Sequence, residues 1–230
     1  MRVRVAILGD IHGKTRYLDW ALEHAVSAGA GMMIQVGDFG FNYDDTFLDD
    51  LVNVTKKHQI PLYAIRGNHD DFSWFTQRAQ LGRYATLIPD GTVMTIGKKR
   101  VAFLGGAVSI DRDFREENIS WWKDERVNPH IVNAWLYDEV KADVLISHES
   151  PLLPNNLPGF KLPPDIIRDC DEDRHHVRMA AEILEPDVIY HGHYHMRYTK
   201  DLYLDSKKAL IEGLNCDGNP INQSMIIRDW

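Results

Sequence analysis

Short apolar segments alternate with amphipathic stretches over the first seventy residues. Residues 3–8, 32–36 and 62–65 are rich in Val, Ile, Leu, Met and Ala and have the length of buried strands. Residues 15–27 and 44–58 lie between them and place apolar side chains at helical spacing. Strand, loop and helix therefore alternate at the lengths of βαβ units, which predicts a parallel central sheet.

The rest of the chain shows a different pattern. Two apolar segments joined through Gly97 predict a hairpin, and a polar, irregular segment at 109–128 predicts an inserted loop. Five prolines between residues 149 and 165 predict a long ordered loop or lid. The hairpin strands, the later helices and the later strands are expected, in chain order, at 92–96, 100–104, 131–140 (helix), 144–146, 171–184 (helix), 188–190, 198–204, 208–211 and 224–227. No change of composition marks a linker, so we expect one domain over residues 1–230.

Charge and composition exclude several classes of protein. The 230 residues carry 26 Lys and Arg against 34 Asp and Glu, and the longest basic cluster is only Lys98-Lys99-Arg100. Long nucleic acid is therefore a disfavoured partner, whereas a small phosphate substrate beside bound metal ions is compatible with an acidic chain. No apolar run approaches the roughly 18 residues of a membrane span, and the apolar run that ends before Asp10 is too short for a signal peptide. With only two cysteines, a reducing, cytoplasmic location is expected. The oligomeric state is left open.

Five polar clusters follow the carboxyl ends of expected strands. They are Gly9-Asp10-Ile11-His12-Gly13, Gly37-Asp38-Phe39-Gly40, Gly67-Asn68-His69-Asp70, Ser147-His148-Glu149 and Gly192-His193-Tyr194-His195. Ligands bind at the carboxyl ends of the strands in open α/β sheets, so these clusters are expected at one edge. Asp10 and His12, like His193 and His195, are two residues apart, which puts both side chains on one side of an extended backbone. The clusters therefore predict metal ions surrounded by Asp, Asn and His.

This ordered set resembles the calcineurin-like metallophosphoesterase family. The family pattern is D-x-H, GD, GNH followed by D or E, a lone His, and GHxH, and the chain matches each element in order from Asp10 to His195. The resemblance implies a four-layer α/β sandwich of two central mixed β-sheets flanked by helices. It also implies a dimetal site at the carboxyl edge of both sheets.

The family's ligand roles carry over to matching positions of this chain. The resemblance implies one metal held by Asp10, His12, Asp38 and His195, and a second held by Asp38, Asn68, His148 and His193. Two ions about 3.5–4 Å apart can share a carboxylate and a water, and a bridging hydroxide then attacks phosphorus in line. The mixed oxygen and nitrogen donors favour Mn²⁺, with Fe, Zn²⁺ or Ni²⁺ as alternatives. A structural zinc site is disfavoured, because such sites prefer Cys and seldom use Asn.

Two residues of the third cluster have implied catalytic roles. His69 matches the family histidine that gives a proton to the leaving oxygen, and Asp70 would orient His69 and keep it protonated. Arg66, just before this cluster, is a candidate contact for a substrate phosphate, with packing at a strand end as the alternative. Trp121 and Trp122 are candidates for stacking on a nucleobase, with burial as anchors of the 109–128 loop as the alternative.

The motif details bear on the substrate. The second cluster reads GDFGFN and lacks the D-R-G continuation of the protein serine/threonine phosphatase branch, and the third ends in Asp rather than Glu. We therefore expect a phosphodiesterase acting on small nucleotide or cyclic-nucleotide-type phosphodiesters. The alternatives are a phosphomonoesterase or nuclease of the same family and, from a different class, a catalytically inactive metal-binding regulatory protein. An inactive relative should have lost a ligand or His69, and this chain retains them all.

Overall fold

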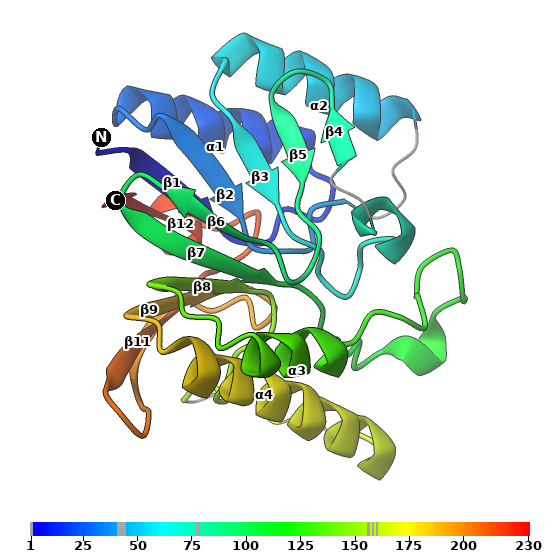
Figure 1. Cartoon of the computed structure of the whole chain (residues 1–230). Coiled ribbons are helices and arrows are strands. Elements are labelled where there is room, and N and C mark those ends of the chain that lie inside the picture. The colour runs from blue at the N-terminus through cyan, green and yellow to red at the C-terminus, as the bar shows by residue number, and fades with distance from the viewer. Residues whose placement is uncertain (1, 41–44, 77–78, 156, 158, 160) are drawn as a thin grey trace.

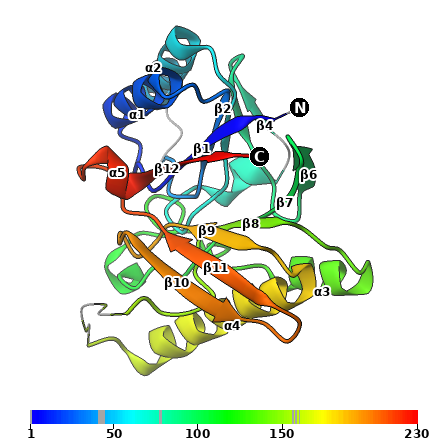
Figure 2. The same cartoon turned by 90° about the vertical axis from the view of Figure 1, so that its left-hand side faces the viewer.

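Four layers build the molecule: two helices, two stacked β-sheets and two further helices (Figures 1 and 2). The computed structural model describes residues 2–40, 45–76, 79–155, 157, 159 and 161–230. Within them, no helix is long and apolar enough to cross a membrane. The layer order is the four-layer sandwich of two mixed sheets that the motif pattern implied, so this expectation is confirmed.

The first sheet has six strands in the order β12-β1-β2-β3-β5-β4. Its central strands run parallel, whereas β12 lies antiparallel to β1 and β4 lies antiparallel to β5. In chain order the strands are β1 (Arg4–Leu8), β2 (Met32–Gln35), β3 (Leu62–Ala64), β4 (Ala79–Leu81), β5 (Ala85–Leu87) and β12 (Met225–Asp229).

The second sheet also has six strands, in the order β10-β11-β9-β8-β7-β6. Here too the central strands are parallel, and the antiparallel partners β6 and β10 close the two edges. In chain order the strands are β6 (Val93–Ile96), β7 (Lys99–Leu104), β8 (Val144–Ser147), β9 (Val188–His191), β10 (Tyr198–Tyr203) and β11 (Lys208–Gly213).

The helices cover the outer faces of the two sheets (Figure 1). Helices α1 and α2 pack on the first sheet, and α3 and α4 pack on the second. Asn128 caps α3 by accepting from the N–H of His130, and Pro129 occupies the first turn, where its missing N–H costs nothing. The described helices are α1 (Thr15–Ser27), α2 (Asp45–His58), α3 (Pro129–Tyr137), α4 (Pro164–Leu184) and the short α5 (Ile221–Ser224).

Three apolar clusters correspond to the three interfaces between layers. Leu18, Leu22 and Leu51 pack under α1 and α2, and Val177 and Leu184 pack under α4. The middle cluster fills the space between the sheets with residues such as Ile7, Ile34, Phe103 and Ile146, all completely buried. Because both faces of each sheet are covered, the central strands read as continuous apolar runs.

Some expected elements differ from the observed ones. The expected parallel strands form the centre of each sheet, and antiparallel strands form the edges of both. Helix α4 begins at Pro164 rather than near 171, since proline fits the first turn of a helix. Strands β4 and β5, of three residues each, were not expected, nor was α5. Residue 44 of the second expected helix and residues 156, 158 and 160 of the proline-rich loop lie outside the described residues.

Candidate metal centre

The polar clusters meet where the carboxyl ends of both sheets come together. Asp10 follows β1, Asp38 follows β2 and Asn68 follows β3, while His148 and His193 follow β8 and β9 of the other sheet. The structure therefore brings together the five loops that the sequence pattern placed at strand ends.

The first expected donor set is assembled closely enough for one cation. Asp10, His12, Asp38 and His195 each offer a ligand atom, and these four atoms lie within 4.8 Å of one another. The Nε2 atom of His195 lies 3.1 Å from Asp10 Oδ2. Asp10 is completely buried, and its carboxylate also accepts the backbone N–H of His193 at 3.0 Å. A cation between these side chains would neutralise two buried carboxylates.

Asp38 lies between the two expected donor sets. Its Oδ2 atom is 3.6 Å from His12 Nε2, on the side of the first set. Its Oδ1 atom is 3.5 Å from His148 Nε2, on the side of the second set. One carboxylate oxygen thus faces each set, which is the arrangement a bridging carboxylate requires.

The second expected donor set is ordered by hydrogen bonds. His148 donates from Nδ1 to the carbonyl oxygen of Val36 at 2.9 Å, so Nε2 is the ring nitrogen directed at the centre, where a metal would replace its proton. Asn68 Oδ1 lies 3.0 Å from that Nε2 atom, so both side chains point to the same place. The ring centroid of His193 lies 5.2 Å from that of His148. Asn68 and Asp38 thus both lie beside His148 Nε2, and His193 lies next to the His148 ring. Among the described residues, the first set alone brings at least three Asp, Glu, His or Cys ligand atoms within 4.8 Å of one another.

Two carboxylates outside the expected sets lie beside metal-site histidines, and one of them is hydrogen-bonded to its histidine. Asp217 Oδ1 accepts from His12 Nδ1 at 2.6 Å, and its other oxygen pairs with Lys14. A carboxylate that accepts from a ligating histidine fixes the tautomer and orientation of its ring, which is the role of Asp217 toward His12. Glu149 is completely buried, and its Oε2 atom lies 3.7 Å from His193 Nε2, which is beyond hydrogen-bond distance. The sequence did not predict the role of Asp217, because this residue belongs to no motif.

The backbone of the centre is strained. His12, Asp38, His193 and His195 have positive φ values of 46°, 53°, 66° and 51°. Left-handed backbone costs a non-glycine residue about 1–3 kcal/mol and tends to persist where function requires it. Four of the eight non-glycine residues with positive φ in the described part of the chain are thus expected ligands.

Two motif glycines leave room for the ligands of other motifs. A Cβ atom on Gly67 would overlap the carboxylate of Asp38, and a Cβ atom on Gly192 would overlap that of Asp10. The glycines of the GNH and GHxH elements are therefore required by close packing between loops.

The electrostatics of the centre favour cations. Although burial lowers the pKa of a histidine, the carboxylates of Asp38 and Asp10 raise the pKa of His12 and of His148 to about 9. Burial raises the pKa of the Asp38 carboxyl, but His148, His69 and His12 outweigh it and hold this pKa well below its ordinary value. In the absence of metal, protons thus compensate the buried negative charge. The donor set, its hydrogen bonds and this charge fit divalent cations.

His69 lies beside the centre. Its backbone N–H donates to Asp38 Oδ1 at 2.9 Å, and its Nε2 atom lies 3.2 Å from Asn68 Nδ2. Burial lowers the pKa of the His69 imidazole, the nearby Arg115 lowers it further, and the Asp38 carboxylate opposes both.

Asp70 was expected to orient His69, and its carboxylate is engaged elsewhere. It accepts three backbone N–H groups, from Phe39 at 3.1 Å and from Gly40 and Gly67 at 2.7 Å. These hydrogen bonds tie the GD loop to the GNH loop. Asp70 therefore stabilises the GD and GNH loops against each other.

Arg66 occupies a packing position and not a substrate position. It is 1% exposed, pairs with Asp90 at 2.8 Å and donates to the backbone carbonyl oxygens of Asp124, Glu125 and Arg126. A contact with substrate phosphate would require these bonds to break. Of the two roles expected for Arg66, the structure therefore shows packing at a strand end and not contact with substrate phosphate.

The two tryptophans differ in exposure. Trp122 is 8% exposed, so its ring cannot stack on a nucleobase and serves as an anchor of the loop. Trp121 is half-buried, with its indole beside the Glu125 carboxyl.

The 109–128 segment reaches the centre through buried polar side chains. Ser109 Oγ accepts from Asn68 Nδ2 at 3.0 Å. Glu125 in turn accepts from the N–H of Ser109 at 2.9 Å and from its Oγ at 2.5 Å. The chain from Glu125 through Ser109 fixes the Asn68 amide so that its oxygen faces the centre. The polar, irregular sequence of this segment predicted an insertion, but it carries no signal for the roles of Ser109 and Glu125.

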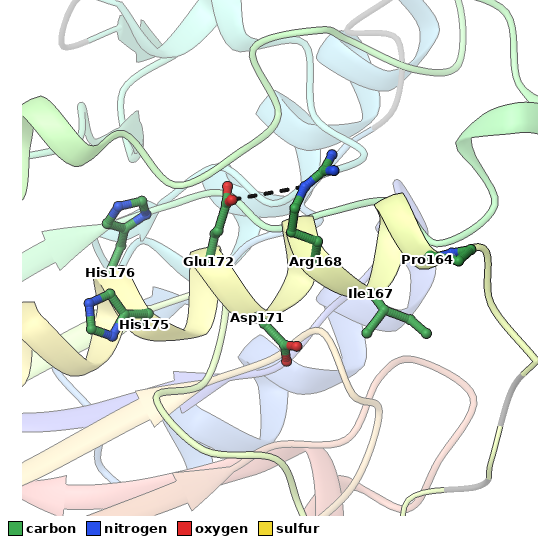
Figure 3. Close-up of a pocket in the computed structure, with 7 residues that line it drawn as sticks. All are labelled: Pro164, Ile167, Arg168, Asp171, Glu172, His175 and His176. Atoms are coloured by element: carbon green, nitrogen blue, oxygen red, sulfur yellow. Dashed lines mark ion pairs between the residues drawn. The ribbon is translucent and has the colours of Figure 1, made fainter.

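A pocket on α4 lies away from this chemistry (Figure 3). Arg168 and Glu172 form an ion pair across it, and His175 and His176 extend from different sides of the helix. None of its lining residues is an expected ligand or catalytic residue. The lining residues are Pro164, Ile167, Arg168, Asp171, Glu172, His175 and His176.

Comparison with known proteins agrees with this geometry. The family model described as calcineurin-like phosphoesterase matches residues 3–197. The chain belongs to this family. Family membership supports metal-dependent phosphoester hydrolysis by a dimetal centre, and the Asp and His cluster around Asp38 is where a metal of that kind would bind.

Solved structures of similar fold have diverged far in sequence. TT1561 of Thermus thermophilus is 13% identical, with 100% of this chain and 99% of that chain covered at a TM-score of 0.61. A structure described as a novel archaeal phosphodiesterase is 11% identical, with 99% and 100% covered and a TM-score of 0.47. Yfce, a phosphoesterase from E. coli, is 16% identical, with 99% and 98% covered and a TM-score of 0.42. At such identities the first likeness supports the fold alone, and the two lower scores support no argument. No curated protein matches the chain in sequence.

Proposed function

We propose that this member of the calcineurin-like family is a phosphodiesterase that hydrolyses small nucleotide or cyclic-nucleotide-type phosphodiesters with two bound divalent metals. Mn²⁺ is the metal we favour, because the donors are carboxylate, amide and imidazole groups without thiolate. The family supplies the reaction class, and the substrate and metal are our inference.

The position of Asp38 is the observation that carries the proposal. Its two carboxylate oxygens face different histidines, His12 at 3.6 Å and His148 at 3.5 Å. Divalent ions held on these two sides supply Lewis-acid stabilisation of the phosphoryl oxygens and an activated water. Asp10 and His195 would complete the first side.

The protein's own acid–base step is assigned to His69. Its Nε2 atom lies beside Asn68, at the border of the second donor set, and so within reach of a leaving oxygen there. His69 would give its proton to that oxygen as the P–O bond breaks. Burial lowers the pKa of His69, so the negative charge of a bound phosphoryl group would be needed to hold the proton on the ring.

The preference for small diesters rests on charge and on motif details. A net charge of −8 opposes long phosphate backbones. The GDFGFN element lacks the D-R-G residues of the protein phosphatase branch. The inactive regulatory alternative is disfavoured because every donor residue is retained, and the four donors of the first set lie within 4.8 Å of one another.

The first experiment compares bis-p-nitrophenyl phosphate with p-nitrophenyl phosphate at measured metal content, with and without Mn²⁺. We expect metal-dependent hydrolysis with the diester preferred. Faster hydrolysis of the monoester would overturn the diesterase assignment, and no turnover by fully loaded protein would favour the regulatory class.

His69→Ala tests the assigned proton donor in the same assay. General acids contribute about 10²–10⁴-fold, and most to poor leaving groups. The variant should keep its metals, lose hydrolysis of nucleoside esters and retain much more of the p-nitrophenyl activity. His130→Ala, an exposed histidine of α3, is the matched control. Equal loss for all leaving groups would remove His69 from this role.

A further inference from the structure

The 109–128 segment presents a guanidinium to the proposed reaction site. Arg115 Nη2 lies 3.4 Å from His69 Nε2, the atom to which we assign proton transfer. The side chain is 20% exposed, so it is held in place and still accessible from solvent. No motif places an arginine here, because Arg115 belongs to the polar segment between β7 and α3.

Asp111 fixes the direction of this guanidinium. Arg115 donates from Nε to Asp111 Oδ1 at 2.7 Å and from Nη2 to Asp111 Oδ2 at 2.8 Å. Its Nη1 donates to the carbonyl oxygen of Ser120 at 3.1 Å. With one edge of the planar group clamped by a carboxylate, the Nη2 end points at His69.

A purely structural role explains this arrangement poorly. The Asp111 side chain is 49% exposed, and ion pairs with such exposed groups contribute little to stability. Arg112, three residues earlier, shows the structural pattern: it joins the segment to α4 through Asp165 and Asp169 at 2.8 Å and 2.7 Å. Arg115 instead directs its Nη2 end toward a residue of the centre.

We propose that Arg115 binds the phosphoryl group of the substrate beside His69, with Asp111 as the residue that positions it. A guanidinium keeps its positive charge, and its charge-assisted N–H bonds suit phosphate oxygens. Because Asp111 occupies Nε and one N–H of Nη2, the second N–H of Nη2, which faces His69, is the donor offered to the substrate. An oxygen bonded to phosphorus that accepts a proton from His69 lies within reach of Nη2. The inference rests on the proposed function, because it places the substrate at the metal centre.

The test measures binding of inorganic phosphate to metal-loaded protein by calorimetry, with metal content determined for each variant. Arg115→Ala should keep both metals and weaken phosphate binding about 10- to 100-fold, the loss expected for a charge-assisted hydrogen bond. Arg115→Lys keeps the positive charge but not the N–H whose direction Asp111 fixes, so its loss of phosphate affinity should be smaller than that of Arg115→Ala. Arg112→Ala removes an arginine from the same segment and should bind phosphate as the wild type does.

Two results would overturn the assignment. One is unchanged phosphate affinity in Arg115→Ala, and the other is an equal loss in Arg112→Ala, which would show that loosening of the segment is responsible. Failure of the proposed function would look different, because wild-type protein with full metal content would then prefer the monoester or hydrolyse no phosphoester at all, whatever the phosphate affinity of the variants.

Discussion

Replacement of Glu125 by Gln should change how stability depends on pH. Glu125 is 1% exposed and accepts two hydrogen bonds from Ser109. The positive charge of Arg112 acts to lower the pKa of the Glu125 carboxyl. Burial raises the pKa of its carboxyl from 4.5 to about 7, against the opposing effect of the hydrogen bonds. Gln has the same size and a carbonyl oxygen for the Ser109 N–H, but it does not titrate.

The sign and size of the effect follow from that pKa. Between pH 4.5 and 7 the folded protein holds a proton that the unfolded chain has released, so stability falls as pH rises through this range. A pKa difference of about 2.5 corresponds to about 3 kcal/mol, lost at about 1.4 kcal/mol per pH unit. The contribution is fully present below pH 4.5 and gone above pH 7. The glutamine of Glu125→Gln would not titrate, so the free energy of unfolding of this variant does not fall in this way as pH rises.

Urea unfolding of wild type and Glu125→Gln at several pH values measures the difference directly, because all other titrating groups are common to both proteins. The free energy of unfolding of the variant, relative to that of the wild type, should rise by up to about 3 kcal/mol between pH 5 and 8. Glu117→Gln, an exposed position in the same segment, should show no such gain. A difference that stays constant with pH would refute the reasoning.

Two further predictions concern metal. Gly192→Ala should lower metal content at least about tenfold, because the new Cβ would displace the Asp10 carboxylate, and disturbance of supporting residues has effects of this size. Gly159→Ala, in open space, is the control. A fully loaded Gly192→Ala protein would contradict the packing argument. Binding of Mn²⁺ near pH 7 should release protons and tighten as pH rises toward 9, because carboxylates raise the pKa of His12 and His148 to about 9 against burial, and ligation requires both rings to be deprotonated. Calorimetry in buffers of different ionisation enthalpy measures the proton count, and identical binding enthalpies in all buffers would argue against it.

The sequence was sufficient for features that local patterns determine. Asp38 and His148 could be assigned to one centre because each follows a buried strand, and parallel strands present their carboxyl ends at a common edge. Most helices and central strands were also predictable, since their apolar residues repeat at helical spacing or in buried runs. The antiparallel edges were not, because three-residue strands such as β4 leave almost no periodic signal.

The supporting residues could not be predicted, since their roles depend on distant contacts. Asp217 meets His12 across 205 positions of sequence, and nothing around it indicates that partner. Arg66 looked like a phosphate contact because it precedes the GNH element, yet it packs under the 109–128 segment. Asp70 has a carboxylate beside His69 in sequence, but its hydrogen bonds go to the loop backbone. Adjacency along the chain does not give the direction of a side chain.

The segment after residue 197 has a practical consequence for recombinant work. The family match ends there, yet β12 pairs with all of β1, β11 pairs with β9, and Asp217 holds His12. A fragment trimmed to the matched residues would leave two central strands as open edges, which recruit other chains and promote aggregation. It would also free the imidazole of His12 to rotate. Trimming to the family boundary should therefore yield an insoluble or metal-poor product, and the strands beyond that boundary have to be kept in any shortened version of this protein.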